Sequence, residues 1–406
     1  MELTILLAFA ALFFVFSLIS GRTQGTILTP PIVFTLGGLL LGQTLLDMEG
    51  LHISEGALHL LAEITLVLVL AADASRISLP SLYTHRAIPS RLLGIALPLI
   101  IAAGAGIGFL LLPGVGLIEA ALIAAILAPT DAALGASVLA DKTVPLPIRQ
   151  SLNVESGLND GIALPAVLFF ACFLNLTHQT GEENWLAFLA LQLSLGPLAG
   201  IAVGWIGGTL IGAAASRGWI TEHFQGVAAM ALAITAFAAA EMVGGNGFIA
   251  AFLAGLTYGN LKISYSHFLH EFTETESEFL ALLTFLLFGL ILLPEALAHA
   301  SWPIVGYALL SLTIVRMIPV AISMLGLGMR LPTLAFLGWF GPRGLASLLF
   351  ALLVLEDLGV EQAETIQSIV GITVFASILL HGLTAAPLSA LYGKWDARQE
   401  AKQDAG

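Results

Sequence analysis

Residues 117–138 read LIEAALIAAILAPTDAALGASV, an apolar run that is interrupted near its middle by Pro129, Thr130 and Asp131. A helix needs about 20 apolar residues to cross a bilayer, so the run is long enough to span a membrane. A proline inside such a helix removes one backbone hydrogen bond and clashes with the preceding turn. The run therefore predicts a membrane helix that is broken near mid-membrane, beside a carboxylate.

A second apolar run, over residues 333–354, contains its own interruption at Gly341-Pro342-Arg343-Gly344. Interrupted helices at corresponding places in two halves of a chain indicate a transporter built from inverted repeats, with its site between the breaks. The alternative is that both prolines only kink packed helices. The charged residues beside the breaks, Asp131 and Arg343, favour the transporter.

The composition excludes most other classes of protein. Of 406 residues, 58% are apolar and only 10% are charged, whereas soluble proteins carry about 25% charged residues. A soluble enzyme, a nucleic-acid-binding protein, a secreted scaffold and a disordered chain are all excluded. The net charge of −13 also argues against polyanionic partners, nucleic acid among them. The single cysteine, Cys172, allows neither an internal disulfide nor a C-x-x-C site.

Thirteen apolar segments are predicted to be membrane helices, because a helix satisfies its own backbone hydrogen bonds in lipid. The segments cover residues 3–20, 27–46, 57–77, 91–112, 117–138, 150–174, 188–214, 223–242, 245–261, 278–298, 302–324, 333–354 and 366–390. The first is interpreted as a retained helix and not a signal peptide, because no basic residue precedes it. We expect an all-α polytopic membrane protein in which residues 1–390 form one transmembrane domain and residues 391–406 a short cytoplasmic tail.

The loop charges predict the orientation. Odd-numbered connections carry basic residues and even-numbered ones carry none, and positive charge marks the cytoplasmic side. The N-terminus is therefore expected outside and the C-terminus inside a cell (inner) membrane. The basic residues are Arg22, Arg76, Arg86, Arg91, Lys142, Arg149, Arg217, Lys262, Arg330, Lys394, Arg398 and Lys402; the acids of the even connections are Asp47, Glu49, Glu55, Glu182, Glu183, Glu295, Glu356, Asp357 and Glu361.

Six charged residues fall well inside predicted helices, where ionisable groups are costly and commonly line a path for ions. They are Asp73, Asp131, Glu155, Asp160, Arg316 and Arg343. At 1.5 Å per residue, Glu155 and Arg316 lie about 8 and about 12 Å from the cytoplasmic ends of their helices. These depths predict an ion pair between Glu155 and Arg316, which leaves Asp160 free to exchange a proton for a cation.

Residues 155–161, ESGLNDG, form the densest polar cluster. Ser156 and Asp160 are four residues apart, so they share one face of a helix. Hard cations take carboxylate, hydroxyl and carbonyl oxygens, and Asp160, Ser156 and backbone oxygens near Thr130 would supply them. The alternative is a polar seam that joins helices, to which Glu155 is assigned.

These residues resemble the monovalent cation/proton antiporter family, in its electroneutral sodium/proton exchanger branch. The similarity extends to Asp73 in the string ADASRI, to Arg316, to the GPRG string at 341–344 and to the HGLT string at 381–384. It covers nearly the whole chain. It implies a homodimer and no cofactor, with a monovalent cation, a proton and the lipid bilayer as partners.

The resemblance also implies roles for single residues. Asp160 is expected to bind the cation and the proton in turn. Asn159, which is Asp in electrogenic relatives, implies one-for-one exchange. Sodium or potassium would be held by Asp160, Ser156, Thr130 and Asp73, with Asp131 as a further ligand, directly or through water. Glu155 and Arg316 are expected to form a structural ion pair, and Arg343 to offset charge where the broken helices cross. Ala132 departs from the proline of many relatives, which bears on ion preference.

Sodium/proton exchange is therefore the leading hypothesis, and potassium/proton exchange is its nearest rival. A cation channel would need a ring of pore-lining charges or a carbonyl filter. An intramembrane enzyme would need a nucleophile–base pair or a cluster of metal ligands. The sequence contains a signal for neither.

Overall fold

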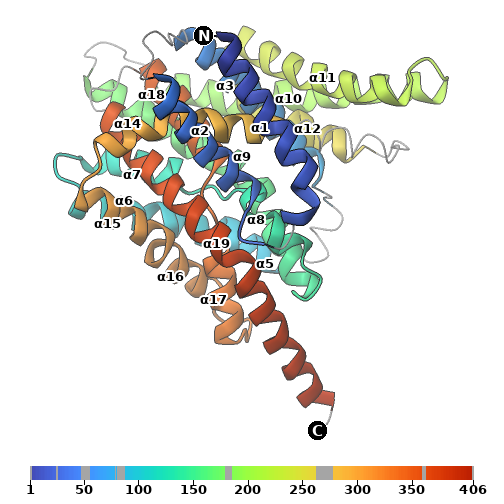
Figure 1. Cartoon of the computed structure of the whole chain (residues 1–406). Helices are drawn as coiled ribbons and strands as arrows, with labels where there is room; N and C mark the ends of the chain where they lie inside the picture. Colours follow the sequence, from blue (N-terminus) through green and yellow to red (C-terminus); the bar gives the residue numbers. More distant parts are fainter. Residues whose placement is uncertain are drawn as a thin grey trace.

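The computed structural model describes residues 2–23, 26–46, 55–77, 79, 87–178, 185–261, 278–358 and 363–404, and every regular element in these ranges is a helix (Figure 1). The first part of the chain forms α1 (Glu2–Thr23), α2 (Pro30–Leu46), α3 (Glu55–Ser75) and a continuous helix made of α5 (Ala87–Arg91), a π-helical turn (Leu92–Ala96) and α6 (Leu97–Leu111). The middle part forms α7 (Leu117–Ile126), α8 (Ala132–Ala140), α9 (Leu146–His178), α10 (Trp185–Ser216), α11 (Glu222–Met242) and α12 (Gly247–Gly259). The last part forms a helix over 278–287 that continues through a π-helical turn (Phe288–Leu292) into α14 (Leu293–Ala298), followed by α15 (Trp302–Leu312), α16 (Ile314–Ser323), α17 (Leu331–Trp339), α18 (Leu345–Leu358) and α19 (Ala363–Asp404).

The helices overlap all of the predicted apolar segments, and both runs that were predicted to break are broken, into α7 and α8 and into α17 and α18. Among the described residues, seven helices are long and apolar enough to cross a membrane. Shorter apolar helices cover Leu7–Thr23, Pro30–Gly42, Leu117–Ile126 and Gly247–Gly259. The chain is thus an all-helical, multi-pass membrane protein. Of the loop charges used for the topology, Asp47, Glu49, Arg86, Glu182, Glu183, Lys262 and Glu361 lie outside the described residues.

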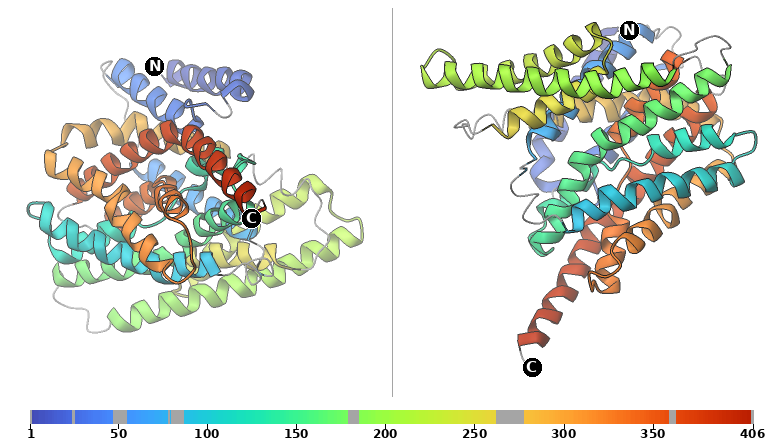
Figure 2. Two further views of the ribbon diagram at one scale, coloured as in Figure 1. Left: turned by 90° about the horizontal axis from the view of Figure 1, so that it is seen from below. Right: turned by 180° about the vertical axis from the view of Figure 1, so that it is seen from behind.

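Helix α10 forms part of the outer surface of the molecule. The long helix α10 packs against α11 and α12, and α12 in turn packs on α3. Figures 1 and 2 show α10 and α11 running side by side along one side of the molecule. Leu198, Trp205 and Leu210 of α10 are each more than half exposed. Such an apolar face suits contact with lipid.

The broken helices lie in the interior. All residues of α7 from Ala120 to Ile126 are buried. α19 passes beside α7, α8 and α18, and its residues Ile366, Ile369 and Ile378 are fully buried. The two breaks are therefore surrounded by other helices, where unpaired backbone groups need partners from the protein itself.

The helix α19 extends far beyond the body of the molecule (Figures 1 and 2). It continues without interruption through residues 391–404, so the boundary predicted at residue 390 falls within a helix. Tyr392 stacks on Phe336 of α17, with ring centroids 4.3 Å apart. Arg330, just before α17, donates a 2.7 Å hydrogen bond from Nη1 to Gln399. The extension is thereby fastened to the first half of the second broken helix.

Candidate ion-binding site

The first break ends α7 at Ile126 and begins α8 at Ala132. Pro129 has no N–H to continue the helix. Asp131 then starts the new helix, because its Oδ1 accepts hydrogen bonds from the backbone N–H groups of Ala133 at 2.7 Å and Leu134 at 3.2 Å. This is the usual chemistry of an aspartate N-cap.

The same aspartate joins the first break to the second. Its backbone N–H donates to the carbonyl of Pro342 at 2.8 Å, and its Oδ2 accepts from the backbone N–H of Leu345 at 2.6 Å. Leu345 is the first residue of α18, so one carboxylate caps the positive ends of both α8 and α18. Gly344 is required here, because a side chain would collide with the Asp131 carboxylate.

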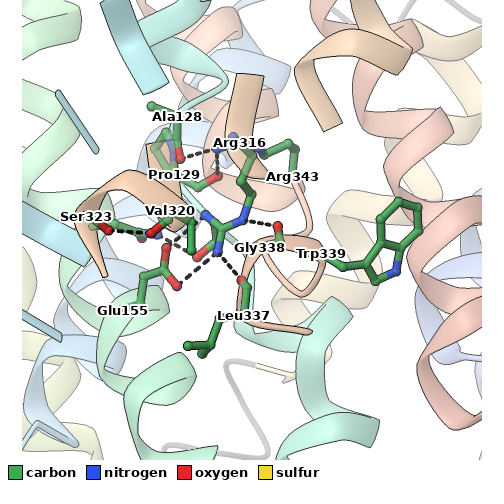
Figure 3. Close-up of polar contacts among 12 residues, drawn as sticks. Ala128, Pro129, Glu155, Arg316, Val320, Ser323, Leu337, Gly338, Trp339 and Arg343 are labelled. Atoms are coloured by element: carbon green, nitrogen blue, oxygen red, sulfur yellow. Dashed lines mark hydrogen bonds and ion pairs between the residues drawn. The ribbon is translucent and has the colours of Figure 1, made fainter. Parts of the chain in front are cut away.

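Two buried arginines satisfy the opposite, negative ends of the half-helices (Figure 3). Arg343 donates from Nη1 to the carbonyls of Ala128 and Pro129, just past the end of α7. Arg316 donates from Nε to Gly338 at 3.1 Å and from Nη2 to Leu337 at 3.4 Å, at the end of α17. Backbone oxygens near Thr130 were expected to face a cation, but those of Ala128 and Pro129 accept hydrogen bonds from Arg343. A guanidinium with several donors occupies them instead.

Arg316 and Glu155 form the ion pair that their depths predict (Figure 3). Two parallel hydrogen bonds link the groups, from Nη1 to Oε1 at 2.8 Å and from Nη2 to Oε2 at 3.0 Å. Their side chains are 1% and 5% exposed. Gly341 makes room for the pair, because a Cβ at this position would lie on the guanidinium of Arg316.

Helix α19 holds the second break from the other side. The Oγ of Ser377 accepts a 2.7 Å hydrogen bond from the backbone N–H of Arg343. The imidazole of His381 lies with Nδ1 3.0 Å from the Ser377 carbonyl oxygen and Nε2 2.9 Å from the Trp339 carbonyl oxygen. These contacts give His381 a hydrogen-bonding role. Ser377 was missed, although its spacing of four residues from His381 in an apolar helix was a usable signal.

The remaining predicted ligands surround one cavity of about 450 Å³. Asp73, Thr130, Asp131, Ser156 and Asp160 all line it. Asn159 does not line the cavity. Its Nδ2 donates a 2.6 Å hydrogen bond to the Oγ1 of Thr130, which does. The structure therefore brings together α3, the break after α7, and α9.

Asp160 differs from the other carboxylates of this cavity. It is buried, and its Oδ1 has no hydrogen-bond partner among the described residues. Asp131 is bound by backbone N–H groups, and Asp73 lies 3.6 Å from Nη1 of Arg76. Arg76 was not among the predicted site residues. Ser156 donates to the carbonyl of Asn153 at 3.2 Å, which leaves its oxygen lone pairs available.

The donors that face the cavity are carboxylate and hydroxyl oxygens, the kind that alkali cations take in proteins. Within the described part of the chain, no group of three or more His, Cys, Asp or Glu residues is placed to hold a metal ion.

Comparisons with known proteins identify the family of the chain. The family model described as "Sodium/hydrogen exchanger, transmembrane" matches residues 6–391. The chain is 24% identical to the K⁺/H⁺ antiporter NhaP of Alkalimonas amylolytica over 92% of this chain and 63% of that protein. It is 31% identical to the Na⁺/H⁺ antiporter NhaP of Pseudomonas aeruginosa over 66% of this chain and 64% of that protein.

The chain thus spans less than two thirds of the length of these relatives. Among solved structures, the sodium proton antiporter MjNhaP1 of Methanocaldococcus jannaschii at pH 8 has the same fold. The TM-score is 0.74 at 18% identity, with 95% of this chain and 100% of the other covered. The family match covers almost the whole chain, so this protein belongs to the transmembrane sodium/hydrogen exchanger family.

Proposed function

We propose that this protein is a secondary antiporter that exchanges a monovalent cation, sodium in the leading case, for a proton across the cell (inner) membrane. The observation that carries the proposal is Asp160. It is a buried carboxylate on the wall of a cavity, with an oxygen that lacks a hydrogen bond and no cationic partner among the described residues. A carboxylate in this position binds one positive charge, from a proton or from a metal cation.

The surrounding contacts support one-for-one exchange. Glu155 is neutralised by Arg316, and Asp131 is bound by the backbone of two helices. Asn159 is neutral and its amide is bonded to Thr130. One negative charge at Asp160 stabilises either a sodium ion or a proton, so a complete cycle moves one charge in each direction.

Thirteen membrane crossings, with the N-terminus outside and the C-terminus inside, remain our proposal for the topology. The half-helix pairs α7–α8 and α17–α18 would be equivalent elements of two inverted repeats. The cavity is lined by Pro30 at the start of α2, Arg76 just after α3, Ala140 at the end of α8 and Glu278 at the start of its helix. The charge rule places all four ends at the cytoplasm, which supports an inward-facing state. We also propose a homodimer, on the family resemblance alone.

The topology predicts a labelling pattern in a cysteine-free background made by Cys172→Ala. A cysteine placed at Ala300, between α14 and α15, is expected to react with a membrane-impermeant maleimide added outside intact cells. A cysteine at Lys142, between α8 and α9, is expected to react only after the cells are opened. Both positions are exposed. The reverse pattern would contradict the orientation.

Competition at one carboxylate predicts a particular pH dependence. Exchange should fall at low pH, where protons occupy Asp160, and at high pH, where few protons are left to carry. Raising the sodium concentration should move the acidic limb to lower pH, because more protons are then needed to displace the cation. Proton flux in reconstituted vesicles, measured across pH at two sodium concentrations, tests this. An acidic limb that ignores sodium would contradict competition.

Potassium/proton exchange is the second candidate function, since one of these relatives is named a K⁺/H⁺ antiporter and the other a Na⁺/H⁺ antiporter. Proton flux in vesicles challenged in turn with sodium, potassium and lithium would decide it. A potassium diffusion potential imposed across the vesicle membrane distinguishes voltage-independent exchange from conduction through a channel. We expect exchange that does not respond to voltage, whereas a cation channel would pass current.

A further inference from the structure

The acids around the cavity can be sorted by what neutralises them. Asp131 accepts hydrogen bonds from three backbone N–H groups, at two helix N-termini. Asp73 has a cationic partner in Arg76, at 3.6 Å between Oδ1 and Nη1. Asp160 has neither among the described residues. Glu278 also lines the cavity but is an exposed acid at the start of its helix. Arg76 is therefore the group that decides whether the buried part of the cavity presents one uncompensated aspartate or two.

The side chain of Arg76 lies where its positive charge would act on a cation that enters the cavity. Its side chain is 31% exposed and lines the same cavity as Asp73 and Asp160. At 3.6 Å, its contact with Asp73 is longer than a hydrogen bond, so it acts by charge and not as a closed pair. Its Nε has no hydrogen-bond partner in the described part of the chain.

The backbone around Arg76 is held in place against α9. A Cβ on Gly157 would lie 3.4 Å from the side chain of Ile77 and 3.8 Å from the carbonyl oxygen of Asp73, so the end of α3 packs directly on the helix that carries Asp160. The amide of Asn260 donates a 2.7 Å hydrogen bond to the carbonyl of Ile77. The backbone that carries Arg76 is thus held by the contacts of its neighbour Ile77 with α9 and with Asn260.

We propose that Arg76 is a specificity-determining residue, which restricts the cavity to monovalent cations by neutralising Asp73. The inference rests on the proposed function of Asp160 and names what selects its ion. Calcium has nearly the ionic radius of sodium and takes the same carboxylate and hydroxyl oxygens. The two ions therefore cannot be distinguished by size, and selection between them must depend on their charge. With Arg76 present, Asp160 is the one buried aspartate of the cavity that has neither a cationic partner nor backbone N–H donors among the described residues, and a single buried carboxylate is too little charge to hold a divalent cation.

Removal of the charge gives a quantitative expectation. At a pH where Asp160 is not occupied by a proton, Arg76→Gln leaves Asp73 uncompensated and should lower the KM for sodium by about three- to tenfold, the effect of one charge several ångströms away near a protein surface. The Coulomb energy doubles for a divalent ion. Inhibition by calcium should therefore strengthen by the square of the sodium factor, which is about ten- to a hundredfold.

The experiment measures sodium-driven proton flux in vesicles that contain the full chain, with calcium chloride added as the inhibitor. Arg76→Lys keeps the charge and should keep both the sodium KM and the tolerance of calcium close to those of the unmodified chain. Arg217→Gln is the matched control, because it removes one arginine that does not line the cavity. We expect it to change neither quantity.

Two results would overturn the proposal. In one, Arg76→Gln retains the sodium KM and the calcium tolerance of the unmodified chain. In the other, Arg76→Lys becomes as sensitive to calcium as Arg76→Gln, so that shape and not charge is responsible. If Arg76→Gln does not transport, calcium binding is measured by the thermal shift of the variants in detergent, and a shift no larger than that of Arg217→Gln also overturns it. Absence of exchange in the unmodified chain would instead contradict the proposed function.

Discussion

Asp160→Asn is expected to lower sodium-driven proton flux by at least about a hundredfold, which amounts to loss of exchange. The amide has nearly the shape of the carboxylate, but it neither titrates nor supplies a negative charge. The Oδ1 of Asp160 has no hydrogen bond to lose in the described structure. The fold should therefore be retained, and the variant should elute as the unmodified chain does in size-exclusion chromatography.

A matched control for this prediction is Glu222→Gln. Glu222 is an exposed acid in the first turn of α11 and does not line the cavity. Its replacement removes the same charge from the protein and should leave flux within about twofold of the unmodified chain. Normal exchange in Asp160→Asn would exclude this carboxylate as the carrier. Equal losses in both variants would show that the assay responds to net charge and not to the site.

The helices and both breaks could be predicted because the rules behind them are local. In lipid a backbone must satisfy its own hydrogen bonds, so an apolar run of sufficient length predicts a helix. A proline such as Pro129 or Pro342 interrupts the pattern wherever it lies. The Glu155–Arg316 pair was also within reach, because depth along a helix can be counted from its end and two buried charges need each other.

The partners at the crossing could not be predicted in the same way. Asp131 was expected to be a cation ligand, yet its oxygens accept hydrogen bonds from α8 and from Leu345, which is 214 residues away in the sequence. Arg343 reaches across a similar separation to Ala128. Such contacts depend on how two distant breaks are aligned in space, and no local spacing encodes that alignment. Arg76 was overlooked because a basic residue near a loop is the ordinary signal of the cytoplasmic side.

The helix ends explain why charged residues are tolerated so deep in an apolar protein. Each break creates one positive and one negative helix end, and four such ends meet at the crossing. Asp131 serves the two N-termini, Arg343 serves the end of α7 and Arg316 serves the end of α17. Once Glu155 offsets Arg316, the crossing is closely balanced without any contribution from Asp160. Asp160 can then gain or lose a positive charge without disturbing the crossing.

Arg316→Ala is expected to be the most destabilising single substitution proposed for this protein. It leaves the Glu155 carboxylate buried without a partner, which costs about 3–5 kcal/mol. It also removes the donors to Leu337 and Gly338 at the end of α17, which adds about 1–3 kcal/mol for unsatisfied buried carbonyls. Glu155→Ala should cost less than Arg316→Ala, because Arg316 keeps these two carbonyl contacts. Thermal unfolding in detergent, together with the yield of monodisperse protein, measures the order.

The double variant Glu155→Met/Arg316→Met separates the charge effect from the capping effect. It buries no charge, so it should unfold at a higher temperature than Arg316→Ala and recover part of the yield. It still lacks donors for the Leu337 and Gly338 carbonyls, so it should remain less stable than the unmodified chain. If either single alanine variant were as stable as the unmodified chain, the pair would contribute nothing to the fold. If the double variant were no more stable than Arg316→Ala, the stranded charge would not be the main cost, and the loss would belong to the uncapped end of α17.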